Sequence, residues 1–234
     1  MILAELFLWM SSFSYLCAWR NSDDGFDLIH CAAPVEIDHC LAAYNGYKPT
    51  TNPHDTQTFE NAGDGNGFKA GGWGMRRSRT RCPEVCPEHY IHHNIAVRNK
   101  ANGIYSNHHL GGCRWEQNTA WMNLANYNMV NRKSTEAEGC VDVPGYGHKL
   151  SGNVSWAYRD QSRVAHLVMF DEQLSQQHNN SFSPADGIEV EPTMFINTDP
   201  KTMFAPRKAD GSLPETSFLK ARDDSPLGQR QMGW

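Results

Sequence analysis

The chain has 234 residues, of which 39% are hydrophobic, and it contains 19 glycines, 11 histidines and 7 tryptophans. This composition argues against helical bundles and doubly wound folds, whose helices need more Leu, Ala, Glu and Lys, and it favours turn-rich β structure. The formal net charge of -5 gives no general attraction to nucleic acid or other polyanions, so an anionic substrate would need locally placed cations.

Residues 1–18 are apolar enough to suggest a secretory signal, which stays the alternative to a start inside a longer gene. They lack a basic n-region and contain Glu5, and the apolar run is too short and too interrupted to cross a bilayer. We therefore expect no membrane partner, and we expect that this start falls inside a longer gene.

A sequence repeat begins near residue 17. The pattern Ala, two residues, Asn recurs at 17–27, 41–45, 95–105 and 119–123, and "NVSW" at 153–156 repeats "NTAW" at 118–121. Asn21 lies 24 residues before Asn45, and Asn99 lies 24 residues before Asn123. This period, with short hydrophobic segments and glycine turns, is typical of one rung of a parallel β-solenoid; a leucine-rich repeat would show regular leucines.

Stacked rungs place residues of equal phase in columns along the axis of the stack, with neighbouring strands about 4.8 Å apart. The four asparagines of the repeat should then form a ladder in which each amide bonds to the next rung, satisfying turn groups that burial would otherwise leave unpaired. A ligand-binding role for these asparagines is the alternative.

The glycine turns set the register of another column. Aligning "SDDGFD" (22–27), "DGNGFK" (64–69) and "KANGIY" (100–105) places Asp27, Lys69 and Tyr105 on successive rungs. Spacings longer than one period predict two insertions, within 46–63 and near 76–89, at the same edge of the stack. Long excursions from a regular scaffold are where binding surfaces are usually built.

Three carboxylates, from Asp23, Asp24 and Asp27, surround the first glycine turn. They repel one another unless a hard cation bridges them, and oxygen ligands beside a turn glycine suit calcium better than zinc. A solvated acidic turn is the alternative.

Lys69, one rung away, suggests a reaction. A cation that binds a substrate carboxylate makes the neighbouring C–H more acidic, and a lysine can remove that proton, which is β-elimination from a uronic acid polymer. A divalent ion and nearby arginines would lower the pKa of Lys69, and the same arginines could draw in a polyuronate or form a solvated basic loop. These arginines are Arg76, Arg77, Arg79 and Arg81.

At these residues the sequence resembles the polysaccharide lyases of family 9, which are right-handed parallel β-helices that cleave pectic polymers. The matching stretches include "AWRNSDDGFDL", "GDGNGFKAGG", "VRNKANGIYSNHH", "NYNM", "DVPGYGH" and "APRKADGSLP", and they extend from about residue 17 to about residue 220. The resemblance implies calcium binding by Asp23, Asp24 and Asp27, Lys69 as the base, and export. It also implies a further calcium-binding aspartate about one rung before Asp23, which would fall at or before Met1.

The predicted substrate-binding set combines the basic loop with residues near the column. It consists of Arg76, Arg77, Tyr105, Asn107, His108, His109 and Asn128. Trp73, Trp115 and Trp121 could stack on sugars, although Trp121 shares the phase of Trp19 and should be in the core. Asp142 and His148 in "CVDVPGYGH" could suggest an acid and a base, but they lie two rungs beyond Lys69, which favours loop capping.

We expect a single domain over 1–234, with β-helix rungs at 17–170 and a meandering segment at 171–234 that covers the stack. The leading hypothesis is a secreted, monomeric, calcium-dependent lyase that acts on an acidic polysaccharide, polygalacturonate or rhamnogalacturonan, without nucleic-acid partners. An inactive β-helix fragment that at most binds acidic polysaccharide is the alternative. A glycoside hydrolase on this scaffold would need paired carboxylates facing one cleft.

Overall fold

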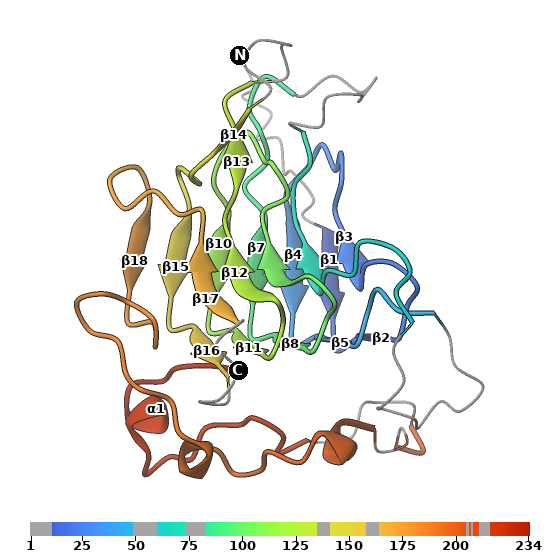
Figure 1. Ribbon diagram of the computed structural model, residues 1–234, viewed down its shortest axis with the longest axis vertical. Coiled ribbons are helices and arrows are strands. Elements are labelled where there is room, and N and C mark those ends of the chain that lie inside the picture. Colours follow the sequence, from blue (N-terminus) through green and yellow to red (C-terminus); the bar gives the residue numbers. More distant parts are fainter. Residues whose placement is uncertain are drawn as a thin grey trace, which may run out of the picture.

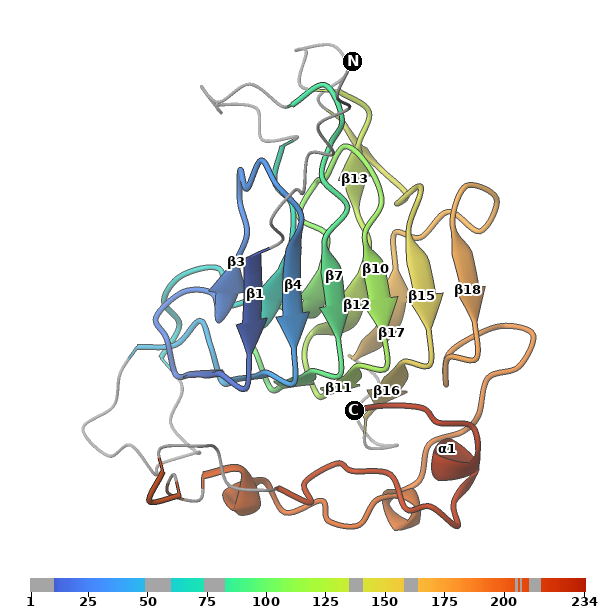
Figure 2. The same ribbon diagram turned by 180° about the vertical axis from the view of Figure 1, so that it is seen from behind.

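A computed structural model describes residues 11–48, 60–73, 83–134, 141–157, 164–204, 206, 208–210 and 216–234. Within these residues the chain winds into a parallel β-helix with three sheets, and each complete rung contributes one strand to each sheet (Figures 1 and 2). The predicted all-β parallel β-helix is thereby confirmed.

The three sheets define three faces. The first sheet, in front in Figure 2, contains β1 (Ser11–Ser14), β4 (Val35–Asp38), β7 (Tyr90–His92), β10 (Arg114–Glu116), β15 (Lys149–Ser151) and β18 (Gln176–His178). The second contains β2 (Cys17–Trp19), β5 (Leu41–Ala43), β8 (Ile95–Val97), β11 (Thr119–Trp121) and β16 (Val154–Trp156). The third contains β3 (Phe26–Asp27), β6 (Phe68–Lys69), β9 (Asn102–Tyr105), β12 (Ala125–Asn128) and β17 (Ala165–Val168). A short antiparallel pair joins β13 (Asn131–Arg132) to β14 (Asp142–Val143).

The core consists of inward-facing columns. The first sheet contributes Ile37, Ile91, Trp115 and Leu150, the second Ala42, Ala96 and Ala120, and the third Phe68, Ile104 and Tyr127; each is at most 1% exposed. These residues pair in register from rung to rung, so every new rung extends the same apolar surface. Because side chains alternate along a strand, the residues next to these columns face outward.

The predicted asparagine ladder is present. The Asn45 amide nitrogen donates to Asn99 Oδ1 at 2.8 Å, and the Asn99 amide nitrogen donates to Asn123 Oδ1 at 2.9 Å. The backbone N–H of Asn21 donates to Asn45 Oδ1 at 3.1 Å, which adds the first rung. The asparagines therefore connect rungs. Asn45, Asn99 and Asn123 are at most 2% exposed, so these three cannot bind a ligand from solvent.

The ladder explains the glycine of the repeat. A Cβ on Gly25 or Gly67 would come within 2.8 Å of the amide nitrogen of Asn45 or Asn99, respectively. Only glycine leaves room for the ladder amides at this corner.

A second ladder, which the sequence reasoning did not predict, links the first and second sheets. Asn94, Asn118, Asn153 and Asn180 bond in the same way, with amide-to-amide distances of 2.9–3.1 Å. Its signal was visible in the repeated "NTAW" and "NVSW".

Both predicted insertions fall in the connections of the strand that carries Lys69. β5 ends at Ala43 and β6 begins at Phe68, and β7 begins only at Tyr90, whereas just residues 98–101 separate β8 from β9. The insertions therefore lie on either side of β6 along the chain.

The C-terminal part continues the helix by one strand and then covers the second sheet. β18 pairs with β15, so strand pairing extends past residue 170. The following segment, orange and red in Figure 1, runs beneath the second sheet and contains η1 (Pro192–Met194), η2 (Pro200–Phe204) and α1 (Pro226–Gln229). Phe195 and Phe218 from this segment pack against Trp156 and Trp121 of the second sheet. None of the described helices has the length and apolarity needed to cross a membrane.

Candidate functional site

The column predicted from the glycine turns lies on the third sheet. Asp27 pairs with Lys69, Lys69 with Tyr105, and Tyr105 with Asn128. The residue before Lys69, Phe68, belongs to the core, so the column side chains lie on the outer face of the sheet. Lys69 is still mostly covered, with 10% of its side chain exposed.

Three carboxylates surround the Lys69 ammonium. Nζ lies 2.9 Å from Asp24 Oδ2, 3.2 Å from Asp27 Oδ2 and 3.8 Å from Asp64 Oδ2. Burial alone would lower the pKa of Lys69, but its hydrogen bond to Asp24 and the charge of Asp27 outweigh burial and raise that pKa above its ordinary value. Acidic groups thus dominate the described surroundings of Lys69. The predicted lowering of its pKa depends on a bound divalent ion and on arginines outside the described residues, so it stays a prediction.

The backbone holds the two most enclosed carboxylates in place. Asp24 has 4% of its side chain exposed, and its Oδ1 accepts hydrogen bonds from the backbone N–H of Asn66 at 2.7 Å and from its amide at 2.8 Å. Asp27 Oδ1 accepts the N–H of Ile29 at 2.8 Å. Each carboxylate therefore keeps its second oxygen directed toward Lys69.

Asp64 is a site residue that the sequence reasoning missed. With Asp23 and Asp24 it forms a group whose nearest carboxylate oxygens all lie within 4.8 Å of one another. The backbone N–H of Asp64 donates to Asp23 Oδ1 at 2.6 Å, and Lys100 donates to the carbonyl of Gly63, which fixes this turn. The glycine-turn alignment could have found Asp64, because it places Asp64 opposite the residue before Asp23.

The donor chemistry of this site fits a hard dication. Asp23, Asp24, Asp27 and Asp64 offer only oxygen atoms, and the single ammonium of Lys69 offsets the charge of just one of these four carboxylates. Close carboxylates of like charge favour binding of a cation such as calcium, which prefers oxygen ligands. Asp27 lies outside the tight group of three, so its role as a ligand stays a prediction.

Tyr105 and His108 form a second polar group beside Lys69. Tyr105 Oη lies 3.1 Å from His108 Nε2, and His108 Nδ1 lies 2.9 Å from Asp142 Oδ1, which Arg132 Nε also contacts at 2.9 Å. Burial raises the pKa of Tyr105 to about 12, although the charge of Lys69 opposes this rise. Burial lowers the pKa of His108, and the neighbouring Asp142 opposes that shift.

The sequence reasoning considered Asp142 only together with His148, favoured loop capping for both, and so missed the contact between Asp142 and His108. The antiparallel strands β13 and β14 bring Asp142 toward the third sheet. His148 is fully buried elsewhere, where its Nδ1 accepts hydrogen bonds from the Cys113 N–H and the Trp115 indole.

The other predicted substrate contacts differ in exposure. Asn128 is half-buried, and its amide donates to Asn102 Oδ1 at 3.1 Å. Asn107 is 3% exposed and has a left-handed backbone with φ of 52°. His109 is fully buried, with Nε2 2.9 Å from the carbonyl oxygen of Pro87, so its ring has no surface open to a sugar.

The predicted basic loop lies outside the described residues; this applies to Arg76, Arg77, Arg79 and Arg81. Stacking of sugars on the three tryptophans is excluded, because Trp73, Trp115 and Trp121 are each at most 1% exposed. The placement of Trp121 in the core is confirmed.

The fold and this site define a parallel β-helix protein with a lysine set among carboxylates on one outer face. Residues 10–155 match the family described as "Pel9A-like, right handed beta helix region", and the chain belongs to this family. The match confirms the resemblance to family 9 polysaccharide lyases and the right-handed fold.

The chain is similar to several lyases. A solved structure of a rhamnogalacturonan lyase is 41% identical and superposes with a TM-score of 0.83 over 95% of this chain and 50% of that chain. The crystal structure of pectate lyase Pel9A is 26% identical, with a TM-score of 0.64 over 92% of this chain and 44% of that chain. Pectate lyase L of Dickeya dadantii (strain 3937) is 27% identical over 210 residues, which are 90% of this chain and 41% of that protein. The chain therefore spans half or less of the length of these proteins.

Proposed function

We propose that this protein cleaves a pectic uronate polymer, polygalacturonate or rhamnogalacturonan, by β-elimination, with Lys69 as the base. The observation that carries the proposal is the position of the Lys69 ammonium, 2.9 Å from Asp24 and 3.2 Å from Asp27, on an outer face of the β-helix. Membership of a family whose relatives are named pectate lyase and rhamnogalacturonan lyase supports it.

The proposed reaction needs few groups. The neutral amine of Lys69 takes the proton at C5 of a uronate, a C4=C5 double bond forms as the C4–O4 bond breaks, and the departing oxygen takes a proton from water. The hydroxide left behind takes the proton from the Lys69 ammonium, which restores the amine. The products are an unsaturated uronide at a new non-reducing end and a shortened chain. Tyr105, His108 and Asn128 lie near Lys69 on the same face and are the described residues that we assign to sugar contacts. We leave Asn107 and His109 out of this set because Asn107 is 3% exposed and His109 is fully buried.

Calcium is the proposed cofactor, with Asp23, Asp24, Asp27 and Asp64 as its ligands. When bound, calcium would neutralise the substrate carboxylate and acidify the C5 proton. These carboxylates also hold the Lys69 ammonium, so an ion that took up their charge would weaken the ion pairs that keep the pKa of Lys69 high.

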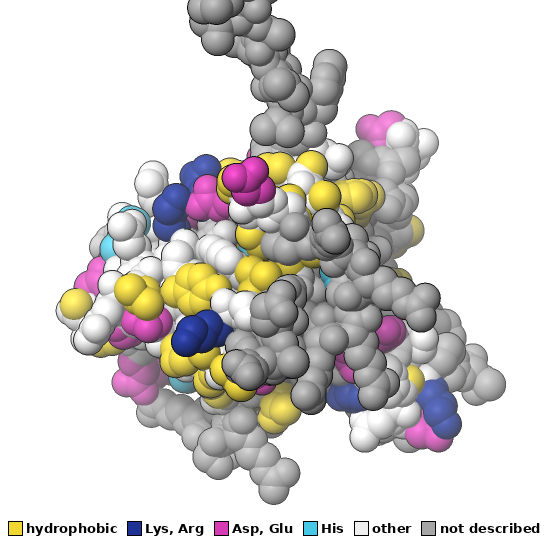
Figure 3. Space-filling model, turned by 90° about the horizontal axis from the view of Figure 1, so that it is seen from above, with side chains coloured by type: hydrophobic (Ala, Val, Ile, Leu, Met, Phe, Trp, Pro, Cys, Tyr) yellow, Lys and Arg dark blue, Asp and Glu magenta, His cyan; other side chains and the backbone are white. Residues whose placement is uncertain are grey.

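Attraction of a polyanion must be local, because the net charge is -5. Figure 3 shows a face on which the basic and acidic side chains drawn in colour are interspersed. Within the described part of the site, Arg132 adds a guanidinium beside Asp142. Export, a monomeric state and the absence of nucleic-acid partners remain predictions.

The test is the release of ultraviolet-absorbing unsaturated uronides from polygalacturonate and from rhamnogalacturonan. The proposal predicts product with at least one polymer, loss of product with a chelator and recovery on adding calcium. Saturated products would instead indicate a hydrolase. Product formation that is insensitive to chelator would remove calcium from the proposal.

One observation favours a second candidate function, binding of acidic polysaccharide without cleavage. The ion pairs of Lys69 hold its ammonium protonated, and a protonated lysine binds carboxylates but cannot act as a base. Calorimetry that shows binding of polygalacturonate, together with no unsaturated product in the presence of calcium, would favour this function.

A further inference from the structure

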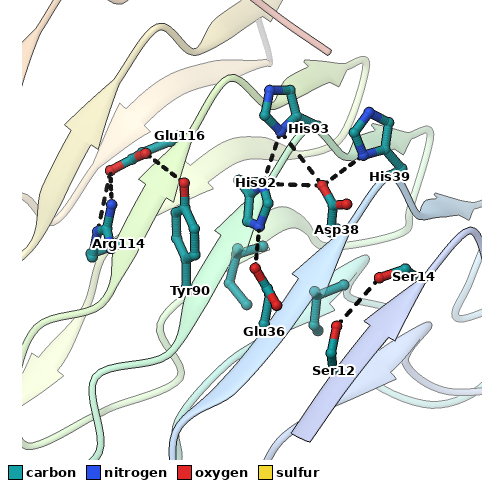
Figure 4. Close-up of polar contacts among 12 residues, drawn as sticks. Ser12, Ser14, Glu36, Asp38, His39, Tyr90, His92, His93, Arg114 and Glu116 are labelled. Carbon is teal, nitrogen blue, oxygen red and sulfur yellow. Dashed lines mark hydrogen bonds and ion pairs between the residues drawn. The ribbon is translucent and has the colours of Figure 1, made fainter. Parts of the chain in front are cut away.

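A histidine cluster lies on the first sheet, on a different face of the β-helix from Lys69 (Figure 4). Asp38 ends β4 and His92 ends β7, and these two residues pair in register. The residues that follow them, His39 and His93, have left-handed backbones with φ of 49° and 50°. This corner interrupts the alternation of side chains, so all four side chains gather at one point of the outer surface.

Three imidazole nitrogens converge on one carboxylate oxygen. Asp38 Oδ1 lies 2.6 Å from His39 Nδ1, 3.0 Å from His92 Nδ1 and 3.5 Å from His93 Nδ1. The Nδ1 atoms of His92 and His93 face each other at 2.8 Å. The dashed lines in Figure 4 show this convergence from two neighbouring strands.

Stacking fixes the orientation of these rings. The His39 and His93 rings stack with centroids 4.9 Å apart and an interplanar angle of 11°. The His92 ring stacks on Tyr90 with centroids 3.9 Å apart. Rings held in this way lose little freedom when they bind a ligand, so the site is preorganised.

The hydrogen bonding of His92 indicates what its Nδ1 binds. Its Nε2 lies 3.0 Å from Glu36 Oε1, and because a carboxylate accepts, Nε2 carries the hydrogen. In the neutral ring, Nδ1 then has a lone pair, and that lone pair faces Asp38 Oδ1 and the Nδ1 of His93. His92 Nδ1, His93 Nδ1 and Asp38 Oδ1 thus lie within 3.5 Å of one another, and a cation held between them would satisfy the lone pairs of all three. A histidine that donates its other N–H to a carboxylate is also the usual arrangement around protein-bound metals.

We propose that His92 Nδ1, His93 Nδ1 and Asp38 Oδ1 form a binding site for a transition-metal dication of the zinc type, with the fourth position open to water. Metal–donor bonds of about 2.0–2.1 Å in a tetrahedral site place donors about 3.3 Å apart. The separations among the three donor atoms, 2.8, 3.0 and 3.5 Å, bracket this value. Imidazole donors suit zinc, nickel or copper, whereas calcium prefers oxygen, so this site differs in chemistry from the acidic site around Lys69.

An ion can reach the cluster from solvent. The side chains of His39 and His93 are 35% and 30% exposed, while those of Asp38 and His92 are 19% and 11% exposed. The bound ion would join two rungs whose strands, β4 and β7, are separated along the chain by both long insertions. Its role would therefore be to clamp these two rungs together at the corner between the first and second sheets.

The test uses zinc as the probe. Protein stripped with a chelator and exchanged into metal-free buffer is titrated with Zn²⁺ by calorimetry, and its thermal midpoint is measured with and without zinc. We expect one zinc per chain and a raised midpoint. In parallel, Co²⁺ should give the intense visible absorption of a tetrahedral site with nitrogen ligands. A wild-type protein that binds no stoichiometric zinc overturns the proposal, and a protonated histidine cluster then explains the geometry.

Variants locate the site. Asp38→Asn and His93→Gln remove one donor each with little change in volume, and each should weaken zinc binding by at least about tenfold and abolish the cobalt spectrum. His178→Gln is the matched control, because His178 is exposed in the same column of the same sheet, two strands beyond Glu116. Asp64→Asn tests the acidic site. Zinc binding that persists in Asp38→Asn and His93→Gln, or that is lost in Asp64→Asn, overturns the assignment.

Discussion

The asparagine ladder predicts that two Asn→Ala substitutions, one inside the ladder and one at its end, differ strongly in their effect on the free energy of unfolding. Asn99 is 2% exposed and lies in the middle of the ladder, whereas Asn21 is exposed at its first rung. The Asn99 side chain accepts from the backbone N–H of Asn45 at 3.2 Å and from its amide at 2.8 Å, and it donates to the Ala42 carbonyl at 3.0 Å and to Asn123 Oδ1 at 2.9 Å. The Asn21 side chain makes one long contact, 3.4 Å, to the Asp24 carbonyl.

The magnitude follows from these contacts. Asn99→Ala removes four hydrogen bonds worth about 1 kcal/mol each and leaves buried partners unpaired, so the free energy of unfolding should fall by about 4 kcal/mol. Asn21→Ala leaves the backbone N–H of Asn21 bonded to Asn45 and should change stability by about 0.5 kcal/mol or less.

Urea unfolding followed by tryptophan fluorescence measures both variants against the wild type. The two changes delete the same atoms, so differences in helix or strand propensity cancel. Equal destabilisation by Asn99→Ala and Asn21→Ala would refute the view that the buried ladder bonds hold the rungs together.

Two further predictions concern pH and metal binding. Burial holds the pKa of His148 at about 3, against 6.5 in the unfolded chain, so the unfolded state takes up the proton first and stability should decline as pH falls from about 6.5, by at most about 1.4 kcal/mol per pH unit. Urea unfolding at pH 7, 6 and 5 gives the free energy of unfolding at each pH. This free energy should fall less steeply with decreasing pH in His148→Gln than in the wild type, and an equally steep fall would contradict the reasoning. Asp64→Asn should weaken calcium binding by about tenfold, because each lost carboxylate weakens a hard-cation site, whereas the exposed control Asp223→Asn should leave it unchanged. Calorimetric titration measures the calcium affinity of both variants and of the wild type, and an Asp64→Asn affinity equal to that of the wild type would exclude Asp64 as a ligand.

Most of the fold could be predicted from the repeat, because residues at the same position in successive repeats of a solenoid stack on one another. Once the glycine turns were aligned, the pairing of Asp27 with Lys69 and of Lys69 with Tyr105 followed directly, and the structure has this register. The asparagine ladder followed from the same phase. In this fold, residues that align in successive repeats of the sequence also lie above one another in the structure.

The alignment of the glycine turns places Asp64 beside Asp23, but the sequence alone did not show that the Asp64 backbone N–H bonds to the Asp23 carboxylate. Residues outside the phase of the repeat could not be placed from the sequence. The histidine cluster was hidden because both insertions separate His39 from His92, which breaks the period between them. The raised pKa of Lys69 depends on how many carboxylates fold around the ammonium, which the sequence did not show.

The most direct test of the central claim, that Lys69 is the base of a lyase, is the initial rate of unsaturated uronide formation by Lys69→Arg with calcium present. Arginine keeps the positive charge that pairs with Asp24 and Asp27 but cannot give up its proton at working pH. The account predicts that Lys69→Arg stays folded, as judged by circular dichroism, and forms no product above background, as does Lys69→Ala. A Lys69→Arg protein that retains the wild-type rate would show that position 69 supplies only charge, and it would contradict the account.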